Sequence, residues 1–293
     1  MIKKIFDNEN AIFMGAKRSL ADCAIGIFGV NYDGTCSFKR GARFGPKAIR
    51  QVSSCLETYC PILNKDLEDI LYVDFGSILI DRNDSKSVIE SVKSATNFLI
   101  NKCLSPIMLG GEHSITSGAI EALVKKYPNL ILIQLDAHAD LRESYMGNKY
   151  SHACAMKRCL EVLPEKKILQ VGIRSGTKEE FQIMNNNNQL VNFCPGGNAQ
   201  ELEEALLPYF KSPIYLTIDL DWFDPSLLAG TGTPEPGGFF WNDFEEILKT
   251  LKDFRIVASD IVELSPEIDQ SGVSSIVAAK VLRSLILSLE NMQ

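Results

Sequence analysis

The sequence predicts an α/β domain in which a mostly parallel sheet is covered by helices on both faces. Short apolar segments alternate eight times with segments of helical periodicity. Most apolar segments are continuously hydrophobic, as parallel strands buried on both faces require. The 293 residues contain no internal repeat, low-complexity segment or linker, so we expect a single domain over residues 1–293.

The expected strands are short apolar segments that end in polar or glycine-containing stretches. In chain order they span residues 25–30, 70–75, 106–109, about 130–140, 168–173, a weak 190–194, 214–221 and 255–262. A polar, glycine-rich loop over residues 31–45 follows the first strand. We expect the carboxyl ends of these strands to lie together at one edge of the sheet, where ligands bind in such folds.

The intervening segments predict helices over residues 46–60, 84–102, 114–127, 150–162, 178–184, 199–210, 242–251 and 271–290. Pro46 suits a first helical turn, and Asp84 or Ser85 suits an N-cap. Periodicity does not distinguish a closed barrel from an open sheet. The irregular spacing of the strands and the variable lengths of the helices favour the open sheet.

Composition and charge argue against several classes of function. The formal charge is −7 and the lysines are scattered, so no basic patch for nucleic acid is expected. No apolar run is long enough to span a membrane. The early lysines are not followed by the apolar segment of a secretory signal. With eight cysteines and no Cys-x-x-Cys pair, the chain fits a cytoplasmic protein with reduced thiols.

The apolar segment before Asp136 ends in the motif Asp136-Ala-His-Ala-Asp140. If this motif continues the strand, Asp136, His138 and Asp140 project to one side, because strand side chains alternate between faces. Two acids crowded beside an imidazole need a positively charged partner. A divalent metal ion is the simplest such partner.

Other expected strands end in residues of the same kind. His113 follows the third strand, Asp219 and Asp221 end the seventh, and Glu263 follows the eighth. Four aspartates and two histidines would serve two metal ions, and carboxylate-rich ligation favours Mn²⁺ over Zn²⁺. Two such ions could hold a bridging water that ionises near neutral pH.

Each of these groups alone also has a structural interpretation. The acids could form polar strand ends or loop caps, and His113 could cap the helix that follows it. His152, near an expected helix start, could simply pack there. These interpretations do not explain why so many such groups lie at the carboxyl ends of strands, so we favour the metal site.

Several motifs together resemble those of the ureohydrolases, the arginase/agmatinase family, in the right order from about residue 25 to 285. They are Gly41-Ala-Arg-Phe-Gly-Pro-Lys-Ala-Ile-Arg50, Gly110-Gly-Glu-His-Ser114, Asp136-Ala-His-Ala-Asp140, Thr217-Ile-Asp-Leu-Asp-Trp-Phe-Asp-Pro225, Gly230-Thr-Gly-Thr-Pro-Glu-Pro-Gly-Gly238 and Asp260-Ile-Val-Glu263. Glu112 stands where many relatives have aspartate. Because it is not an expected ligand, we do not expect this difference to affect the chemistry.

The resemblance implies a three-layer α/β/α fold around an eight-stranded, mostly parallel sheet. It also implies two Mn²⁺ ions per chain, hydrolysis of a guanidinium group to urea and an amine, and assembly as a homo-oligomer, a trimer or hexamer. Glu263 would grip the guanidinium, His152 would shuttle a proton at an ordinary imidazole pKa, and Asp140 would also accept one. The implied metal ligands are His113, Asp136, His138, Asp140, Asp219 and Asp221.

The substrate is expected to be agmatine, hydrolysed to putrescine and urea. Arginases carry an asparagine two residues after the last acid of Asp-x-His-x-Asp, where this chain has Arg142. The segments 140–152 and 172–175 resemble agmatinases. The alternatives are a ureohydrolase for guanidinobutyrate or arginine, whose carboxylate Arg142 could bind, a single-zinc deacetylase, and a metal-stabilised protein without activity.

Overall fold

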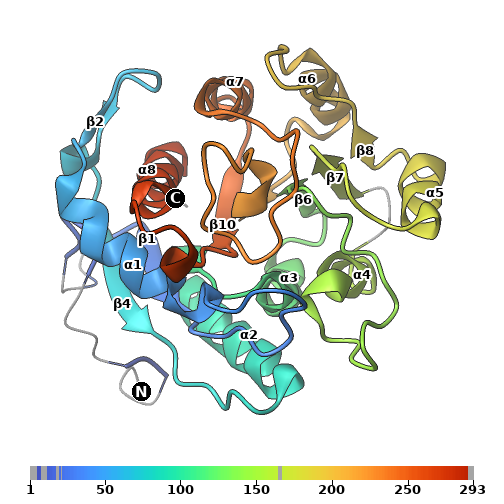
Figure 1. The fold of residues 1–293 in the computed structure, drawn as a ribbon. Coiled ribbons are helices and arrows are strands. Elements are labelled where there is room, and N and C mark those ends of the chain that lie inside the picture. The colour runs from blue at the N-terminus through green and yellow to red at the C-terminus, as the bar shows by residue number, and fades with distance from the viewer. Residues whose placement is uncertain (1–4, 8–11, 18–19, 21, 164–166, 290–293) are drawn as a thin grey trace.

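The computed structural model describes residues 5–7, 12–17, 20, 22–163 and 167–289, and eight of its strands form one parallel sheet (Figure 1). The strands are β1 (Ile25–Gly29), β4 (Tyr72–Ser77), β5 (Ser105–Leu109), β6 (Ile131–Leu135), β7 (Ile168–Val171), β8 (Leu190–Val191), β9 (Ile214–Asp219) and β10 (Ile256–Val262). Their order is β4-β1-β5-β10-β9-β6-β7-β8. Because β4 and β8 are not paired with each other, the sheet is open, as expected.

Helices cover both faces of this sheet and give the three-layer α/β/α fold that the sequence predicted (Figure 1). The helices are α1 (Gly45–Val52), α2 (Ser85–Asn101), α3 (Thr116–Lys126), α4 (Ala155–Leu160), α5 (Lys178–Asn186), α6 (Gln200–Leu206), α7 (Trp241–Leu251) and α8 (Val273–Ser288). In Figure 1, α1, α8, α7 and α6 lie on one side of the strands and α2, α3 and α4 on the other.

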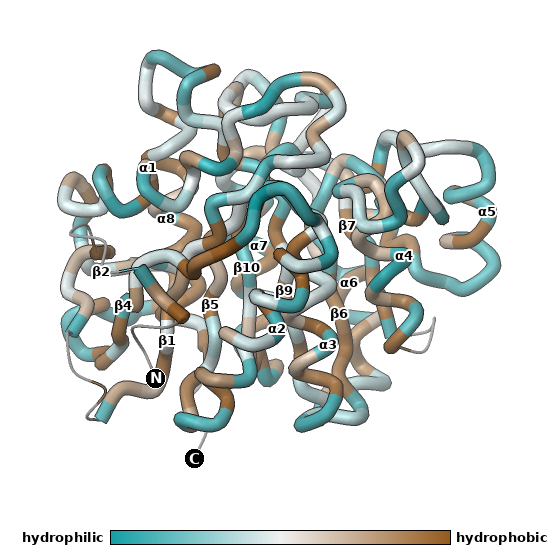
Figure 2. Tube along the Cα trace, turned by 90° about the horizontal axis from the view of Figure 1, so that it is seen from below, coloured by the Kyte–Doolittle hydropathy of each residue, from teal (hydrophilic) through white to brown (hydrophobic). Residues whose placement is uncertain are grey.

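Alternating side chains along each strand divide the core between the two faces. Ile131 and Ile133 of β6 pack in the cluster that includes α6, α7 and α8. Leu132, between them, packs in the cluster that includes α2, α3 and α4. Figure 2 shows hydrophobic residues along inner strands such as β6 and hydrophilic residues in the outer turns. This two-sided burial explains why the strands are continuously apolar.

The expected helix over residues 46–60 is too long. Helix α1 ends at Val52, a 3₁₀ turn follows over Ser53–Cys55, and β2 (Tyr59–Cys60) pairs antiparallel with β3 (Lys65–Asp66). The Ser53 hydroxyl donates to the carbonyl of Arg50 and accepts from the Met14 amide. Such local hydrogen bonds compete with helix continuation. The last expected helix ends at Ser288 in α8, and its predicted end at Glu290 lies outside the described residues.

No helix in the described part of the chain combines the length and the apolar character needed to cross a bilayer. This agrees with the absence of a long apolar run in the sequence.

A buried ion pair fixes α1, the helix that follows the loop over residues 31–45, against β4. Arg50 donates from Nε to Asp74 Oδ2 and from Nη2 to Asp74 Oδ1, both at 2.8 Å. Both side chains are fully buried. The Asp74 carboxylate also accepts from the Phe13 and Gly76 amides. The pair therefore holds three separate segments in one place.

We predict that Asp74→Ala destabilises the protein by about 3–5 kcal/mol, because it leaves the Arg50 guanidinium buried without its counter-charge. Urea denaturation measures the change. The matched control is Glu90→Ala, which removes an exposed partner of Lys86 on α2 and should leave the midpoint unchanged. A loss below about 1 kcal/mol for Asp74→Ala would contradict this role.

Candidate metal centre and pocket

The polar residues singled out in the sequence lie at the carboxyl ends of four neighbouring strands, β5, β10, β9 and β6. The chain leaves β5 through α3 and returns three positions across the sheet at β6, with β10 and β9 between them. Ligands of open α/β sheets bind at such crossings. The residues are His113 after β5, Glu263 after β10, Asp219 and Asp221 at the end of β9, and Asp136, His138 and Asp140 after β6.

The expectation that Asp136, His138 and Asp140 share one side of a strand is wrong, because β6 ends at Leu135. Asp136 Oδ1 accepts from the His138 amide at 2.6 Å, and Asp140 has a left-handed backbone with φ 53°. This conformation costs about 1–3 kcal/mol in a residue other than glycine. The Met156 amide holds it by donating to the Asp140 carbonyl at 3.0 Å. Turn geometry, not strand alternation, therefore aims these side chains.

The last two residues of the expected strand 214–221 also form a turn. β9 ends at Asp219, and Leu220–Trp222 is a 3₁₀ turn in which Asp219 Oδ1 accepts from the Asp221 amide at 3.0 Å. The two aspartates thus remain close together although they are not spaced along a strand. Their second carboxylate oxygens reach two different histidines.

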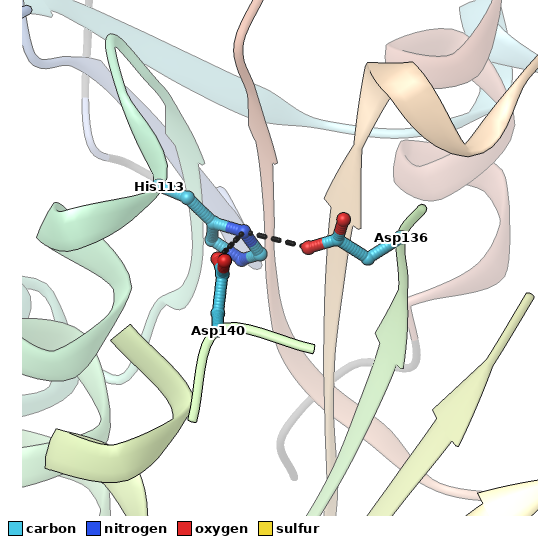
Figure 3. Close-up of side chains that lie close together, drawn as sticks. All are labelled: His113, Asp136 and Asp140. Carbon is cyan, nitrogen blue, oxygen red and sulfur yellow. Dashed lines mark ion pairs between the residues drawn. The ribbon is translucent and has the colours of Figure 1, made fainter. Parts of the chain in front are cut away.

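The imidazole of His113 faces three carboxylates. Its Nδ1 lies 3.0 Å from Asp136 Oδ2, 3.2 Å from Asp140 Oδ2 and 3.3 Å from Asp219 Oδ2. The ring is fully buried, and Figure 3 shows it between Asp136 and Asp140. In spite of these distances, Nδ1 makes no hydrogen bond of acceptable geometry within the described structure.

The hydrogen bond at the opposite ring nitrogen, Nε2, shows whether Nδ1 carries a hydrogen or a lone pair. Thr217 Oγ1 donates to Asp260 Oδ1 at 2.5 Å, so its lone pair accepts from His113 Nε2–H at 2.9 Å. The neutral ring then has a lone pair on Nδ1. A lone pair that faces three carboxylates across about 3 Å needs a cation between them. The residues therefore fit a divalent metal ion.

A second cluster adjoins the first and shares Asp136 with it. His138 Nδ1 lies 3.0 Å from Asp221 Oδ2 and 3.7 Å from Asp136 Oδ1. Asp136 therefore directs one oxygen to each histidine. The Gln134 amide nitrogen donates to Asp136 Oδ2 at 2.6 Å and fixes this orientation. Two adjacent clusters with one shared carboxylate are the arrangement that a two-ion site needs.

The charges of the cluster require compensation. Burial, followed by the neighbouring charges of Asp221 and Asp136, raises the pKa of Asp219 well above its ordinary value. Burial and the charge of Asp136 raise the pKa of Asp140 to about 6. Burial opposes a charge on His113, but the three carboxylates outweigh it and raise its pKa. Without a metal ion the site would take up protons, and a divalent ion replaces them.

A pocket of about 190 Å³ opens onto both clusters. Glu263 lines it with a left-handed backbone, φ 66°, and its Oε1 accepts from the His113 amide at 2.8 Å. Burial and the nearby Glu112 carboxylate raise the pKa of Glu263. An acid in such a pocket favours a cationic ligand of small size. Glu263 therefore lies beside the His–Asp clusters, where the sequence predicted it.

His152 also lines the pocket, at the start of the 3₁₀ turn that leads into α4. The expectation of an ordinary imidazole pKa is wrong. Burial, followed by the charge of His138, lowers the pKa of His152 to about 4. The ring is therefore neutral near pH 7, and its protonated form gives up a proton readily. Tyr145 packs edge to face on it with ring centroids 5.9 Å apart.

Arg142 lines the mouth of the pocket together with Glu180 and Tyr145. The sequence predicted that this residue influences substrate specificity. Its Nε lies 3.8 Å from Glu180 Oε2, and its guanidinium lies over the Tyr145 ring at 5.2 Å. Glu180 is buried and also accepts from the Leu141 amide at 2.9 Å. Arg142 therefore has one acidic and one aromatic neighbour at the mouth, and 39% of its side chain stays exposed.

Several residues that orient the site were missed in the sequence. Thr217 and Asp260 lie inside motifs that were noted, but nothing in the spacing showed that they set the orientation of His113. Arg174 donates to the carbonyls of Asp221 and Glu235, both at 2.7 Å, and so holds the loop over residues 224–238 against the cluster. The motif at 172–175 was a signal for Arg174, although its partners were not visible.

We predict that Mn²⁺ raises the melting temperature of the protein by several degrees. Saturation at 100 times Kd contributes about 2.7 kcal/mol. Asp219→Asn keeps the acceptor for the Asp221 amide but removes a buried charge. This variant should therefore melt higher than the wild type without metal and gain less from Mn²⁺. Differential scanning fluorimetry with and without chelator measures both effects.

The control for this prediction is Asp253→Asn, which removes an exposed carboxylate outside the site and should keep the full gain from Mn²⁺. A wild-type melting temperature that does not respond to the ion would contradict a metal site at this cluster. An Asp219→Asn variant that gains as much as the wild type would exclude Asp219 as a ligand.

Comparisons with known proteins agree with this geometry. Residues 23–288 match the model of the arginase family. Agmatinase from Bacillus cereus is 33% identical over 278 residues, which are 94% of this chain and 95% of that protein. N(1)-aminopropylagmatine ureohydrolase from Thermococcus kodakarensis is 38% identical over 263 residues, 87% of each chain.

A solved structure supports the same relationship. The crystal structure of a candidate agmatinase from Clostridium difficile has a TM-score of 0.86 and 40% sequence identity to this chain. The match covers 92% of this chain and 99% of that one. With the family model matched over nearly the whole sequence and the expected fold in place, this chain belongs to the arginase family.

Proposed function

We propose that this protein hydrolyses the guanidinium group of agmatine to putrescine and urea, with two Mn²⁺ ions per chain as cofactors. The observation that carries the proposal is the buried Glu263 carboxylate in a small pocket beside the paired His–Asp clusters. A planar cation fits such a carboxylate. The adjoining clusters would hold the divalent ions that activate water for hydrolysis. The proposed ligands are His113, Asp136, His138, Asp140, Asp219 and Asp221.

A guanidinium is a poor electrophile because resonance stabilises it, so its hydrolysis depends on a strong nucleophile held at close range. Bound divalent ions supply this by lowering the pKa of a coordinated water. Glu263 binds the substrate through charge-assisted hydrogen bonds and sets the plane of the cation. The His113 amide holds Glu263 Oε1 at 2.8 Å, so the carboxylate has a fixed direction before substrate arrives.

Two residues of the pocket are assigned to proton transfer. Asp140 accepts a proton at its carboxylate when the nucleophile attacks. His152 carries a proton to the departing amine. Burial lowers its pKa, so the resting ring is neutral and accepts the proton that it then passes on.

Arg142 favours agmatine over substrates that carry a carboxylate. Its Nε faces Glu180 at 3.8 Å and its guanidinium lies over the Tyr145 ring, so part of its charge is already engaged within the protein. A carboxylate at this mouth would lose water without gaining a full counter-charge, which is unfavourable. Agmatine has no carboxylate and places an amine in this acidic region instead.

The test is a urea-release assay with added Mn²⁺ across agmatine, arginine, guanidinobutyrate and N(1)-aminopropylagmatine. We predict the highest kcat/KM for agmatine, with arginine and guanidinobutyrate lower by about 10²-fold, because the pocket mouth offers their carboxylate no full counter-charge. If agmatine is turned over no faster than the others, the agmatine assignment is wrong.

A variant sharpens this test of specificity. Glu180→Gln keeps an acceptor for the Leu141 amide but leaves Arg142 without its counter-charge. It should therefore raise the guanidinobutyrate-to-agmatine ratio of kcat/KM. A ratio that stays unchanged would show that Arg142 does not influence the choice of substrate.

We predict that Glu263→Gln lowers kcat/KM for agmatine by about 10²-fold, because the neutral amide keeps its bond to the His113 amide but loses the charge that binds the guanidinium. Metal content, measured by mass spectrometry, should stay at the wild-type level. Glu267→Gln, in the exposed turn that follows, is the control. Urea production that survives Glu263→Gln would contradict the role given to this residue.

Three further predictions remain, of which the assembly rests on the family resemblance and the other two on the sequence pattern and the cysteines. They are a single domain over residues 1–293, assembly as a trimer or hexamer, and a cytoplasmic location. Light scattering of the purified protein measures the assembly directly.

A further inference from the structure

The loop over residues 31–45 makes one contact with the pocket that the proposed reaction has not used. Thr35 Oγ1 lies 2.5 Å from Glu112 Oε1, 3.0 Å from the His152 amide nitrogen and 3.2 Å from His152 Nδ1. One hydroxyl thus touches a buried carboxylate and both nitrogen atoms on the near side of His152. These contacts join segments separated by 77 and 117 residues along the chain.

Glu112 receives hydrogen bonds on both of its oxygens. The Thr35 amide donates to Oε2 at 2.7 Å, and the Ser114 hydroxyl donates to Oε1 at 2.6 Å. The carboxylate is completely buried and lies beside the glycine pair that follows β5. Burial raises the pKa of the Glu112 carboxyl, and the hydrogen bonds from Ser114 and Thr35 oppose this rise. Distances of 2.5–2.6 Å from both hydroxyls are those of hydrogen bonds to a charged acceptor.

These contacts determine where the proton of Thr35 points. A backbone amide only donates, so the His152 amide uses one lone pair of Thr35 Oγ1. The hydroxyl proton then goes to Glu112, the nearer and stronger acceptor. The second lone pair of the hydroxyl faces His152 Nδ1. Nδ1 must therefore carry a hydrogen, and the lone pair of the neutral ring is on Nε2.

We propose that Thr35, oriented by Glu112, is a positioning residue that holds His152 as the Nδ1–H tautomer and leaves Nε2 as the acceptor that faces the substrate. The proposal extends the proposed function, since it concerns the residue assigned to proton transfer. It also gives Glu112 a role, which the sequence did not suggest. Glu112 acts on the proton transfer through Thr35 and His152 and does not line the pocket.

The close packing of the loop makes this arrangement rigid. A side chain at Gly111 would place its Cβ 1.9 Å from the Tyr32 carbonyl oxygen, so only glycine fits here. The Glu112 amide donates to the same carbonyl at 2.8 Å. Thr35, three residues beyond Tyr32, is therefore held close to the Glu112 carboxylate. The Tyr32 carbonyl thus ties the loop to the segment that carries Glu112.

Ser151 is the competing candidate for orienting the ring. Its hydroxyl lies 3.3 Å from His152 Nδ1. Unlike Thr35, it has no carboxylate partner among the described residues that fixes the direction of its proton, so it can donate to the ring or accept from it. Ser151→Ala is therefore the matched control for Thr35→Val.

The test measures the tautomer directly. The chain has three histidines, so ¹⁵N labelling of histidine gives three rings to assign, and His152→Asn identifies the signals of His152. Spectra are recorded near pH 7.5 on protein loaded with diamagnetic Zn²⁺. We expect Nδ1–H at His152 in the wild type, in Thr35→Ser and in Ser151→Ala. Thr35→Val should shift the ring towards Nε2–H.

Kinetics give an independent measurement. Thr35→Val should lower kcat for agmatine by about 10²-fold, the scale of one proton-transfer contribution, with KM within twofold and unchanged Mn²⁺ content. Thr35→Ser should restore most of kcat, since it restores the hydroxyl. An Nε2–H ring in the wild type would overturn the proposal, as would an unchanged ring in Thr35→Val or an equal loss in Thr35→Ser. Failure to release urea from any guanidino compound would instead reject the proposed function, whatever the tautomer.

Discussion

The interaction on which the site depends is the contact between His113 Nδ1 and three carboxylates. Asp260 and Thr217 fix the ring from behind, so the lone pair of Nδ1 can only point at Asp136, Asp140 and Asp219. This arrangement is unstable unless positive charge enters it. The protein thus gathers negative charge at the carboxyl ends of its central strands, and a divalent ion would both balance this charge and supply the chemistry.

The rest of the structure serves to hold that concentration of charge in place. Four central strands end at the same level, and the turns after them use left-handed backbone at Asp140 and Glu263 to aim carboxylates inward. Arg174 holds the loop over residues 224–238 against Asp221. The Arg50–Asp74 pair fixes α1, the helix that follows the loop over residues 31–45. Strain at the site is therefore balanced by well-made contacts around it.

Much of this was predictable from the sequence. Continuous apolar strands gave the open parallel sheet, and the strand ends gave the positions of His113, Asp219, Asp221 and Glu263, because strand ends depend on local patterns. What could not be predicted depends on contacts between distant segments. The lowered pKa of His152, the partner of Arg142 and the Thr35–Glu112 contact follow only from packing.

The central claim is that the two clusters sharing Asp136 hold two divalent ions. Anomalous diffraction from crystals grown with Mn²⁺ tests it most directly, because the signal at the manganese edge counts and locates the ions. The account predicts two peaks, one beside His113 and one beside His138, with Asp136 between them. A single peak, or none with His113 Nδ1 donating a hydrogen bond to a carboxylate, would contradict it.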